Sequence, residues 1–189
     1  MARLIYASIV SLDGYVADAE GRFDWGEPDE EVHAFVNELQ RGIGTHLYGR
    51  RLYDVLVAWE TWDVSDEPDV IRDYAQIWRG ADKVVYSRTL LEPRSERTRI
   101  VEEFDLTAVV ELKALASRDI LIGGPELAAM ALAGGIVDEI HLFVAPIVCG
   151  AGTPVFPDDV LLQLQLVDEQ RFANGTVHLH YSVLQAVDS

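Results

Sequence analysis

Short apolar segments alternate with longer amphipathic segments along most of this chain, and this alternation restricts the fold more than any other feature. The short segments have the length and composition of strands and cover residues 3–10, 45–48, 83–86 and 118–122. Strands that are separated by helices form a mostly parallel sheet with helices on both of its faces. The sequence therefore predicts a three-layer α/β/α fold around such a sheet.

The amphipathic segments between these strands carry the signals of helices. The first helix is expected to start near Pro28, with acidic residues at 29–31 near its positive end and apolar residues recurring up to Ile43. The other predicted helices cover residues 50–58, 70–78, 107–115 and 125–133. Gly134 and Gly135 follow the last helix and end it.

The C-terminal part of the chain has a different pattern, which predicts an antiparallel hairpin. A strand over residues 138–145 comes first, and Asn174-Gly175 has the composition of a hairpin turn. After that turn apolar residues alternate with polar ones, so we expect one buried face and one exposed face that carries His178 and His180. Loops are expected over residues 11–24 and 146–159.

Length, charge and cysteine content narrow the class of protein. A chain of 189 residues, 49% of them apolar, suits a single domain over residues 1–189. The net charge of −17 argues against binding to nucleic acid or to an anionic membrane, since both need positive charge. The N-terminal residues read as a strand rather than a signal peptide, no apolar segment approaches the roughly 20 residues of a membrane span, and Cys149 is the single cysteine. These features fit a cytoplasmic protein.

Common nucleotide and metal motifs are missing from the sequence. Gly150-Ala151-Gly152 runs into Pro154 and cannot open a helix as a Rossmann fingerprint requires. His178 and His180 share one strand face, but the sequence shows no third ligand beside them, so no metal site is expected.

Three junctions at the ends of predicted strands carry residue types that bind phosphate. At Gly49-Arg50-Arg51 two arginines stand at the positive end of a helix, where an anion between them would remove the electrostatic conflict. Two solvated arginines are the alternative. Ser87-Arg88-Thr89 offers two hydroxyls and a guanidinium, and residues 123–126 either present free amides at a helix start or form a simple tight turn. Because ligands collect at the carboxyl ends of parallel strands, we expect the junctions to meet there.

The order and spacing of several motifs make the chain resemble a known family. The motifs are SLDGYVA (residues 11–17), FDW (23–25), LYGRRLY (47–53), VYSRTL (85–90), IGGPEL (122–127), VDEI (137–140), PIVCGAG (146–152) and FP (156–157). They cover nearly the whole chain. With them the chain resembles the dihydrofolate reductase-like superfamily and, most closely, the reductase domain of bacterial bifunctional riboflavin-biosynthesis deaminase/reductases.

This resemblance implies a dihydrofolate reductase-like fold and an NADPH site built from the three junctions. The residues that it places beside the nicotinamide are Ala7, Leu12, Gly14 and Val16. The residues that it places beside the phosphates and the adenosine are Gly49, Arg50, Arg51, Ser87, Arg88, Thr89, Gly123, Gly124, Pro125, Glu126 and Leu127. Arginines fit NADPH better than NADH, because NAD sites use an acidic residue on the ribose hydroxyls.

The reaction implied by the resemblance is hydride transfer to a C=N or C=O bond of a small heterocyclic substrate, such as a ribosylamino-pyrimidine. The acids expected near the substrate are Asp13, Asp24 and Glu30, although Glu30 equally suits the helix dipole. Trp25, Tyr53 and Trp59 are expected to stack on a planar substrate, or else to belong to the core.

Two other functions stay open on the sequence. One is reduction of a pterin, or of another carbonyl or imine, with the same cofactor. The other is a non-catalytic dinucleotide-binding protein that keeps the fold. In each case the expected partners are a small molecule and a second copy of the chain, since the terminal hairpin leaves a sheet edge suited to a two-fold dimer.

Overall fold

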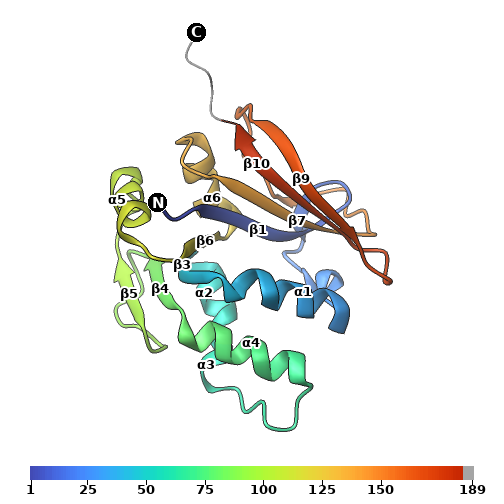
Figure 1. The fold of residues 1–189 in the computed structure, drawn as a ribbon, viewed down its shortest axis with the longest axis horizontal. Coiled ribbons are helices and arrows are strands. Elements are labelled where there is room, and N and C mark those ends of the chain that lie inside the picture. Colours follow the sequence, from blue (N-terminus) through green and yellow to red (C-terminus); the bar gives the residue numbers. More distant parts are fainter. Residues whose placement is uncertain (185–189) are drawn as a thin grey trace.

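A central eight-stranded sheet organises the chain, with the strand order β5-β4-β3-β6-β1-β7-β10-β9 (Figure 1). The computed structural model describes residues 1–184. The strands of the sheet are β1 (Leu4–Ser11), β3 (Ile43–Gly49), β4 (Asp82–Tyr86), β5 (Thr98–Val101), β6 (Asp119–Gly123), β7 (Glu139–Ala145), β9 (Gln163–Arg171) and β10 (Val177–Leu184). From β5 to β7 all neighbours are parallel, and β10 and β9 are antiparallel. This agrees with the largely parallel sheet and the terminal hairpin that the sequence predicts.

Helices cover both faces of this sheet, which confirms the three-layer α/β/α prediction. The helices are η1 (Asp24–Gly26), α1 (Glu30–Arg41), α2 (Arg50–Leu56), α3 (Ala58–Thr61), α4 (Asp69–Gly80), α5 (Leu106–Leu115) and α6 (Pro125–Ala133). Tyr6 of β1 packs with α5 and α6, whereas Ile9 of the same strand packs with α1. Because successive side chains of a strand point to opposite faces, α1 and the pair α5 and α6 lie on opposite sides. Figure 1 shows α4 beside α1 on its face.

The first helix is shorter at both ends than the apolar pattern suggests. Asp29 caps it, because its carboxylate accepts a hydrogen bond from the backbone N–H of Val32 at 3.0 Å, so Pro28 lies outside the helix. The helix stops at Arg41, and Ile43 is the first residue of β3 rather than the last apolar residue of the helix. Ile43 packs with Ile5 in the core, and this burial favours its position in β3 over a position at the end of the helix.

Four further segments differ from the sequence prediction. The two expected loops each contain a short strand, β2 (Tyr15–Asp18) and β8 (Gly152–Pro154), which pair as a small antiparallel sheet. Strand β5 was missed because a four-residue edge strand has too little pattern to recognise. The helix predicted over residues 50–58 divides into α2 and α3.

The hairpin at residues 174–175 is confirmed, but its histidines do not lie on an exposed face. His178 is buried against Phe35 of α1 and Phe143 of β7, and His180 is largely buried beside His141. The polar residues of β10 therefore face α1, where helix side chains cover the sheet. Within residues 1–184 no helix has the length and apolar content needed to cross a membrane.

Candidate functional site

The parallel register brings the three predicted phosphate junctions to one edge of the sheet. In register, Gly49 at the end of β3 lies beside Tyr86 of β4, and Tyr48 lies beside Gly123 of β6. The segment that follows β3 is therefore flanked by the two other junctions. This is the arrangement that the sequence predicts for a phosphate-binding edge.

Arginines of α2 connect this junction to both of its neighbours. The Arg50 guanidinium donates a short hydrogen bond to Thr89 after β4. The Arg51 guanidinium lies 2.7 Å from a carboxylate oxygen of Glu126 at the start of α6. Arg50 also lies 3.3 Å from Asp54. Carboxylates thus supply the negative charge that the two arginines need at the start of a helix, and Arg51, with an 89% exposed side chain, stays open to solvent.

Arg88 does not join this pair of arginines. Its guanidinium lies 2.7 Å from Glu103, which follows the edge strand β5. Its neighbour Ser87 is buried and accepts hydrogen bonds from the backbone N–H groups of Thr89 and Leu90 at 3.2 and 3.0 Å. Ser87 therefore shapes the turn, while Arg88 reaches a ligand only by leaving Glu103.

The last residue of β6, Gly123, and the residue after it, Gly124, are glycines for different structural reasons. Gly124 has a φ of 88°, which side-chain-bearing residues rarely adopt, and it directly precedes Pro125 at the start of α6. Gly123 is buried, and a Cβ there would lie 2.6 Å from the Cδ2 atom of Leu52. Its missing side chain lets α2 pack against β6. Leu127, predicted beside the cofactor, is a buried residue of the core cluster under α6.

The segment predicted to border the nicotinamide follows β1 at the same edge. Ala7 packs with Ile5 on the α1 side of the sheet and is half-buried. Leu12 is 68% exposed, which is unusual for a leucine next to a strand end and leaves it free to contact a ligand. Gly14 has a φ of 87° and turns the chain into β2, where Val16 packs on the core.

Asp13 connects this segment to the loop that follows β7. Its carboxylate accepts hydrogen bonds from the Ser11 hydroxyl at 2.7 Å, from the Cys149 amide at 3.0 Å and from the Gly150 amide at 2.7 Å. These bonds, that of Ser11 foremost, lower the pKa of Asp13 below its ordinary value. These contacts join the segment after β1 to the segment that contains Cys149 and Gly150, so Asp13 is placed to position both segments.

A cavity of about 190 Å³ lies on the α1 side of this edge, between η1 and the ends of β1 and β7. Trp25, predicted to contact substrate, lines it together with Ile9 and Phe143. The acid that lines it is Glu27. Asp24 and Glu30 flank Glu27 in the sequence, are exposed and do not line the cavity. The sequence signal for Glu27 was present in the acidic run before α1, but nothing there singles it out.

The other two predicted stacking residues belong to aromatic packing. Tyr53 is fully buried, and its hydroxyl accepts a hydrogen bond from the Arg94 amide at 2.9 Å, so no ring face is free for a substrate. Trp59 packs against Trp62 and Tyr74. The core alternative therefore holds for Tyr53, and Trp59 contacts other aromatic side chains rather than the cavity.

Another cavity, of about 270 Å³, lies at the opposite edge of the sheet near Arg41, Asp73 and Arg118. None of the predicted site residues lines it. The predicted residues and the smaller cavity share the carboxyl edge, so that edge is the candidate site.

Known proteins are similar to this chain in sequence and in fold. The family model described as the RibD C-terminal domain matches residues 2–178. The uncharacterized protein YyaP of Bacillus subtilis (strain 168) is 32% identical over 184 residues, which are 95% of this chain and 94% of that protein. A pyrimidine reductase-like protein from Corynebacterium diphtheriae NCTC aligns with a TM-score of 0.64 at 18% identity, over 97% of this chain and 92% of that one. A diaminohydroxyphosphoribosylaminopyrimidine deaminase/5-amino-6-(5-phosphoribosylamino)uracil reductase from Thermotoga maritima aligns with a TM-score of 0.68 at 15% identity, over 97% of this chain and 57% of that one.

Proposed function

Because the chain belongs to the RibD C-terminal domain family, we propose that it is a reductase that uses NADPH to reduce a C=N or C=O bond of a small heterocyclic, ribosylamino-pyrimidine-like substrate. The chain has the dihydrofolate reductase-like fold of that family's reductase domains. Two relatives of solved structure are named for pyrimidine reduction, one of them as reductase-like, which supports this substrate class.

The observation that carries the proposal is the position of Arg50 and Arg51. Their guanidiniums extend from the middle junction to residues of both neighbouring junctions, at 2.7 Å in the case of Arg51 and Glu126. Guanidinium forks and exposed hydroxyls are the donors that phosphate groups require. NADPH fits this edge better than NADH, because a ribose phosphate needs cations whereas free ribose hydroxyls need an acidic partner.

Different residues of this edge have different proposed roles in cofactor binding and in the reaction. Bound NADPH supplies the hydride. Arg50, Arg51 and, after leaving Glu103, Arg88 would bind its phosphates, with Arg51 assigned to the extra phosphate on the ribose. The segment from Leu12 to Val16 would border the nicotinamide together with Ala7. The Asp13 hydrogen bonds to Cys149 and Gly150 hold that segment in place.

The cavity beside Trp25 is the proposed substrate site. Trp25 and Phe143 offer apolar ring surfaces for a planar heterocycle. Glu27 is the proposed proton donor, because its carboxyl lines the cavity, and Asp24 and Glu30 are the nearest alternatives in the sequence. We further propose that the protein acts in the cytoplasm as a homodimer that pairs through the exposed edge of β9.

Titration of the full chain with NADPH and with NADH tests the cofactor assignment. Arg51→Ala should weaken NADPH binding about tenfold or more, the usual worth of a hydrogen bond to a charged group, and should leave NADH binding nearly unchanged. Arg72→Ala is the matched control, since Arg72 is an exposed arginine of α4 that pairs with Asp69. It should alter neither affinity.

Three outcomes separate the candidate functions. Equal losses for both cofactors in Arg51→Ala would contradict the assignment of Arg51 to the ribose phosphate. If neither cofactor binds the unchanged protein, the reductase proposal is wrong. Tight NADPH binding without NADPH oxidation against pyrimidine, pterin and simple carbonyl substrates would identify a binding protein instead.

A further inference from the structure

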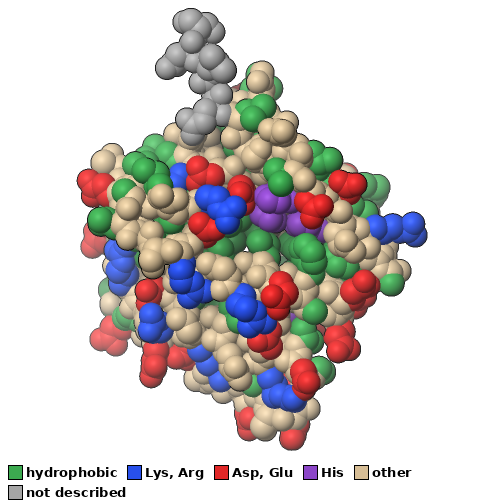
Figure 2. All heavy atoms as spheres, in the orientation of Figure 1, with side chains coloured by type: hydrophobic (Ala, Val, Ile, Leu, Met, Phe, Trp, Pro, Cys, Tyr) green, Lys and Arg blue, Asp and Glu red, His purple; other side chains and the backbone are tan. Residues whose placement is uncertain are grey.

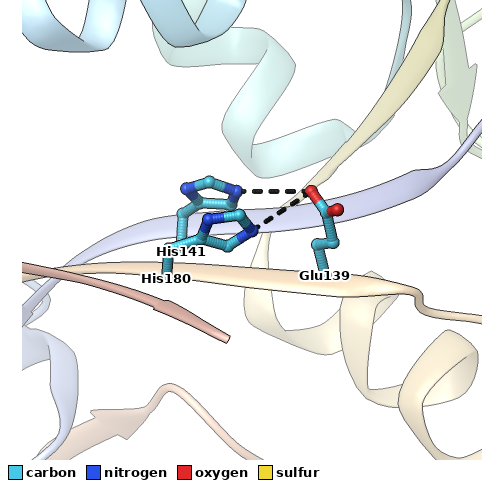
Figure 3. Close-up of side chains that lie close together, drawn as sticks. All are labelled: Glu139, His141 and His180. Carbon is cyan, nitrogen blue, oxygen red and sulfur yellow. Dashed lines mark ion pairs between the residues drawn. The ribbon is translucent and has the colours of Figure 1, made fainter. Parts of the chain in front are cut away.

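Glu139, His141 and His180 meet on the α1 side of the sheet. Glu139 and His141 are two residues apart on β7, so their side chains point to the same face. His180 of β10 lies directly opposite His141 in the antiparallel register. Figure 3 shows both imidazole rings side by side, each with one nitrogen directed at the Glu139 carboxylate.

The spacing of the three side chains is that of metal ligands. The Nε2 atoms of His141 and His180 lie 3.7 and 3.3 Å from the Oε2 atom of Glu139. The three ligand atoms all lie within 4.8 Å of one another. Ligands at about 2.0–2.2 Å from a tetrahedral Zn²⁺ stand roughly 3.3 Å apart, so small side-chain rotations suffice to close around an ion.

The nitrogens that face the carboxylate are unsatisfied. Within residues 1–184 the Nε2 atoms of His141 and His180 are buried and have no hydrogen-bond partner. The side chain of His141 is 94% buried, since only 6% of its surface is exposed. A buried polar atom without a partner is costly, so two of them aimed at one point indicate a missing ligand.

Neighbouring groups hold the three side chains in the orientation that a metal needs. The Nδ1 atom of His141 lies 3.0 Å from the Nε2 atom of His178. If His141 donates this hydrogen bond, its proton stays on Nδ1, and the Nε2 atom of His141 keeps a free lone pair for a metal. Arg3 donates to the Oε1 atom of Glu139 at 2.7 Å, which turns Oε2 toward the histidines. Asp119 lies 3.0 Å from the Nε atom of Arg3 and balances its charge.

Small parts of the three side chains are exposed at the surface, whereas the two Nε2 atoms themselves are buried. Figure 2 shows histidine side chains at the surface above α1, beside charged side chains. The side chains of His141, His180 and Glu139 are 6%, 16% and 14% exposed. Because the cluster supplies three ligands, a tetrahedral ion bound there would have one coordination position left for water.

We propose that Glu139, His141 and His180 form a binding site for a divalent transition-metal ion, and that this ion is Zn²⁺. Two imidazoles and one carboxylate suit Zn²⁺ and related first-row ions rather than Mg²⁺ or Ca²⁺. The site joins β7 to β10 and lies one strand away from Ala7. It does not depend on the reductase proposal.

Metal titration of the full chain tests this site. After dialysis against a chelator, calorimetry should show one Zn²⁺ bound per chain, and Co²⁺ should give a visible absorption band. Glu139→Gln and His180→Gln should each weaken Zn²⁺ binding about tenfold or more. Glu169→Gln is the matched control, because Glu169 is an exposed residue of β9 opposite Leu179, whose side chain points to the other face. It should bind Zn²⁺ as the unchanged protein does.

Thermal unfolding gives a second reading that does not depend on calorimetry. Zn²⁺ should raise the melting temperature of the unchanged protein and of Glu169→Gln, but not that of the two ligand variants, because an ion that binds only the folded state stabilises it. Circular dichroism identifies a variant that fails to fold, and the other variant then serves. Absence of saturable Zn²⁺ and Co²⁺ binding, or equal binding by all variants, overturns the proposal.

Discussion

Gly123→Ala tests whether α2 is held against the sheet by the absence of a single methyl group. The added Cβ would lie 2.6 Å from the Cδ2 atom of Leu52 and 3.3 Å from two ring atoms of Tyr48. Tyr48 is buried in the sheet and cannot withdraw, so Leu52 and α2 must move. Overpacking of this kind costs about 1–3 kcal/mol.

A second glycine isolates that packing cost. Any Gly→Ala change at a conformation that alanine can adopt also stabilises by about 0.4–1 kcal/mol, because the unfolded chain loses freedom. At Gly80, the last residue of α4, a Cβ would meet nothing within 4 Å. Since both variants share the entropic gain, Gly123→Ala should be about 1–3 kcal/mol less stable than Gly80→Ala.

Urea unfolding at 25 °C, followed by tryptophan fluorescence and circular dichroism, measures this difference. For a chain of this size the same loss corresponds to a melting temperature lower by about 2–12 °C. If Gly123→Ala proves as stable as Gly80→Ala, Leu52 moves aside freely and the packing explanation for Gly123 is wrong.

Two more changes address Asp13 and Tyr53. Asp13→Asn should lower stability at neutral pH, where the carboxylate accepts bonds from Ser11, Cys149 and Gly150. Because the folded-state pKa of Asp13 lies below its ordinary value of about 3.9, this stability is present above that value and is lost as pH falls through the folded pKa, so the gap in urea midpoints should close in acid. A gap that persists unchanged at low pH would contradict the role of its charge. Tyr53→Phe should cost about 1–3 kcal/mol in urea unfolding, because the Arg94 amide loses its partner, with NADPH and substrate affinity unchanged. If Tyr53→Phe is as stable as the unchanged protein but binds substrate less tightly, Tyr53 contacts the substrate and the packing interpretation is wrong.

The arrangement of the sheet could be predicted because its signals are local. Strands β3 and β6 of the parallel part end at recognisable breaks, Gly49 and Gly123, and parallel strands place such breaks at one edge of the sheet. The backbone convergence of the three junctions therefore follows from the alternation of strands and helices alone. Strand β5 and the pairing of β2 with β8 depend on contacts between distant segments, and short segments carry no periodicity that reveals them.

Side-chain partners were the part of the site that the sequence could not supply. The spacing Glu139-x-His141 and the spacing His178-x-His180 are both visible as strand alternation. What joins them is the register that places His141 opposite His180, and this register is a property of the folded sheet. Similarly, Arg88 follows the end of a strand as Arg50 does, yet only the structure shows that it turns toward Glu103.

The carboxylates paired with the edge arginines bear on how an acidic chain could bind phosphate at the proposed site. With a net charge of −17, unpaired arginines would attract many alternative partners. Arg51 instead lies against Glu126, and the two side chains are 89% and 76% exposed. Exposed pairs of this kind contribute about 0–1 kcal/mol, so an incoming phosphate displaces Glu126 at little cost. The ion pair holds the Arg51 guanidinium at the edge of the sheet, between the segments after β3 and β6. Because the pair is weak, Glu126 competes little with a phosphate for this guanidinium. The acidic composition of the chain is therefore compatible with the proposed cofactor site, because the ion pair between Arg51 and Glu126 is weak.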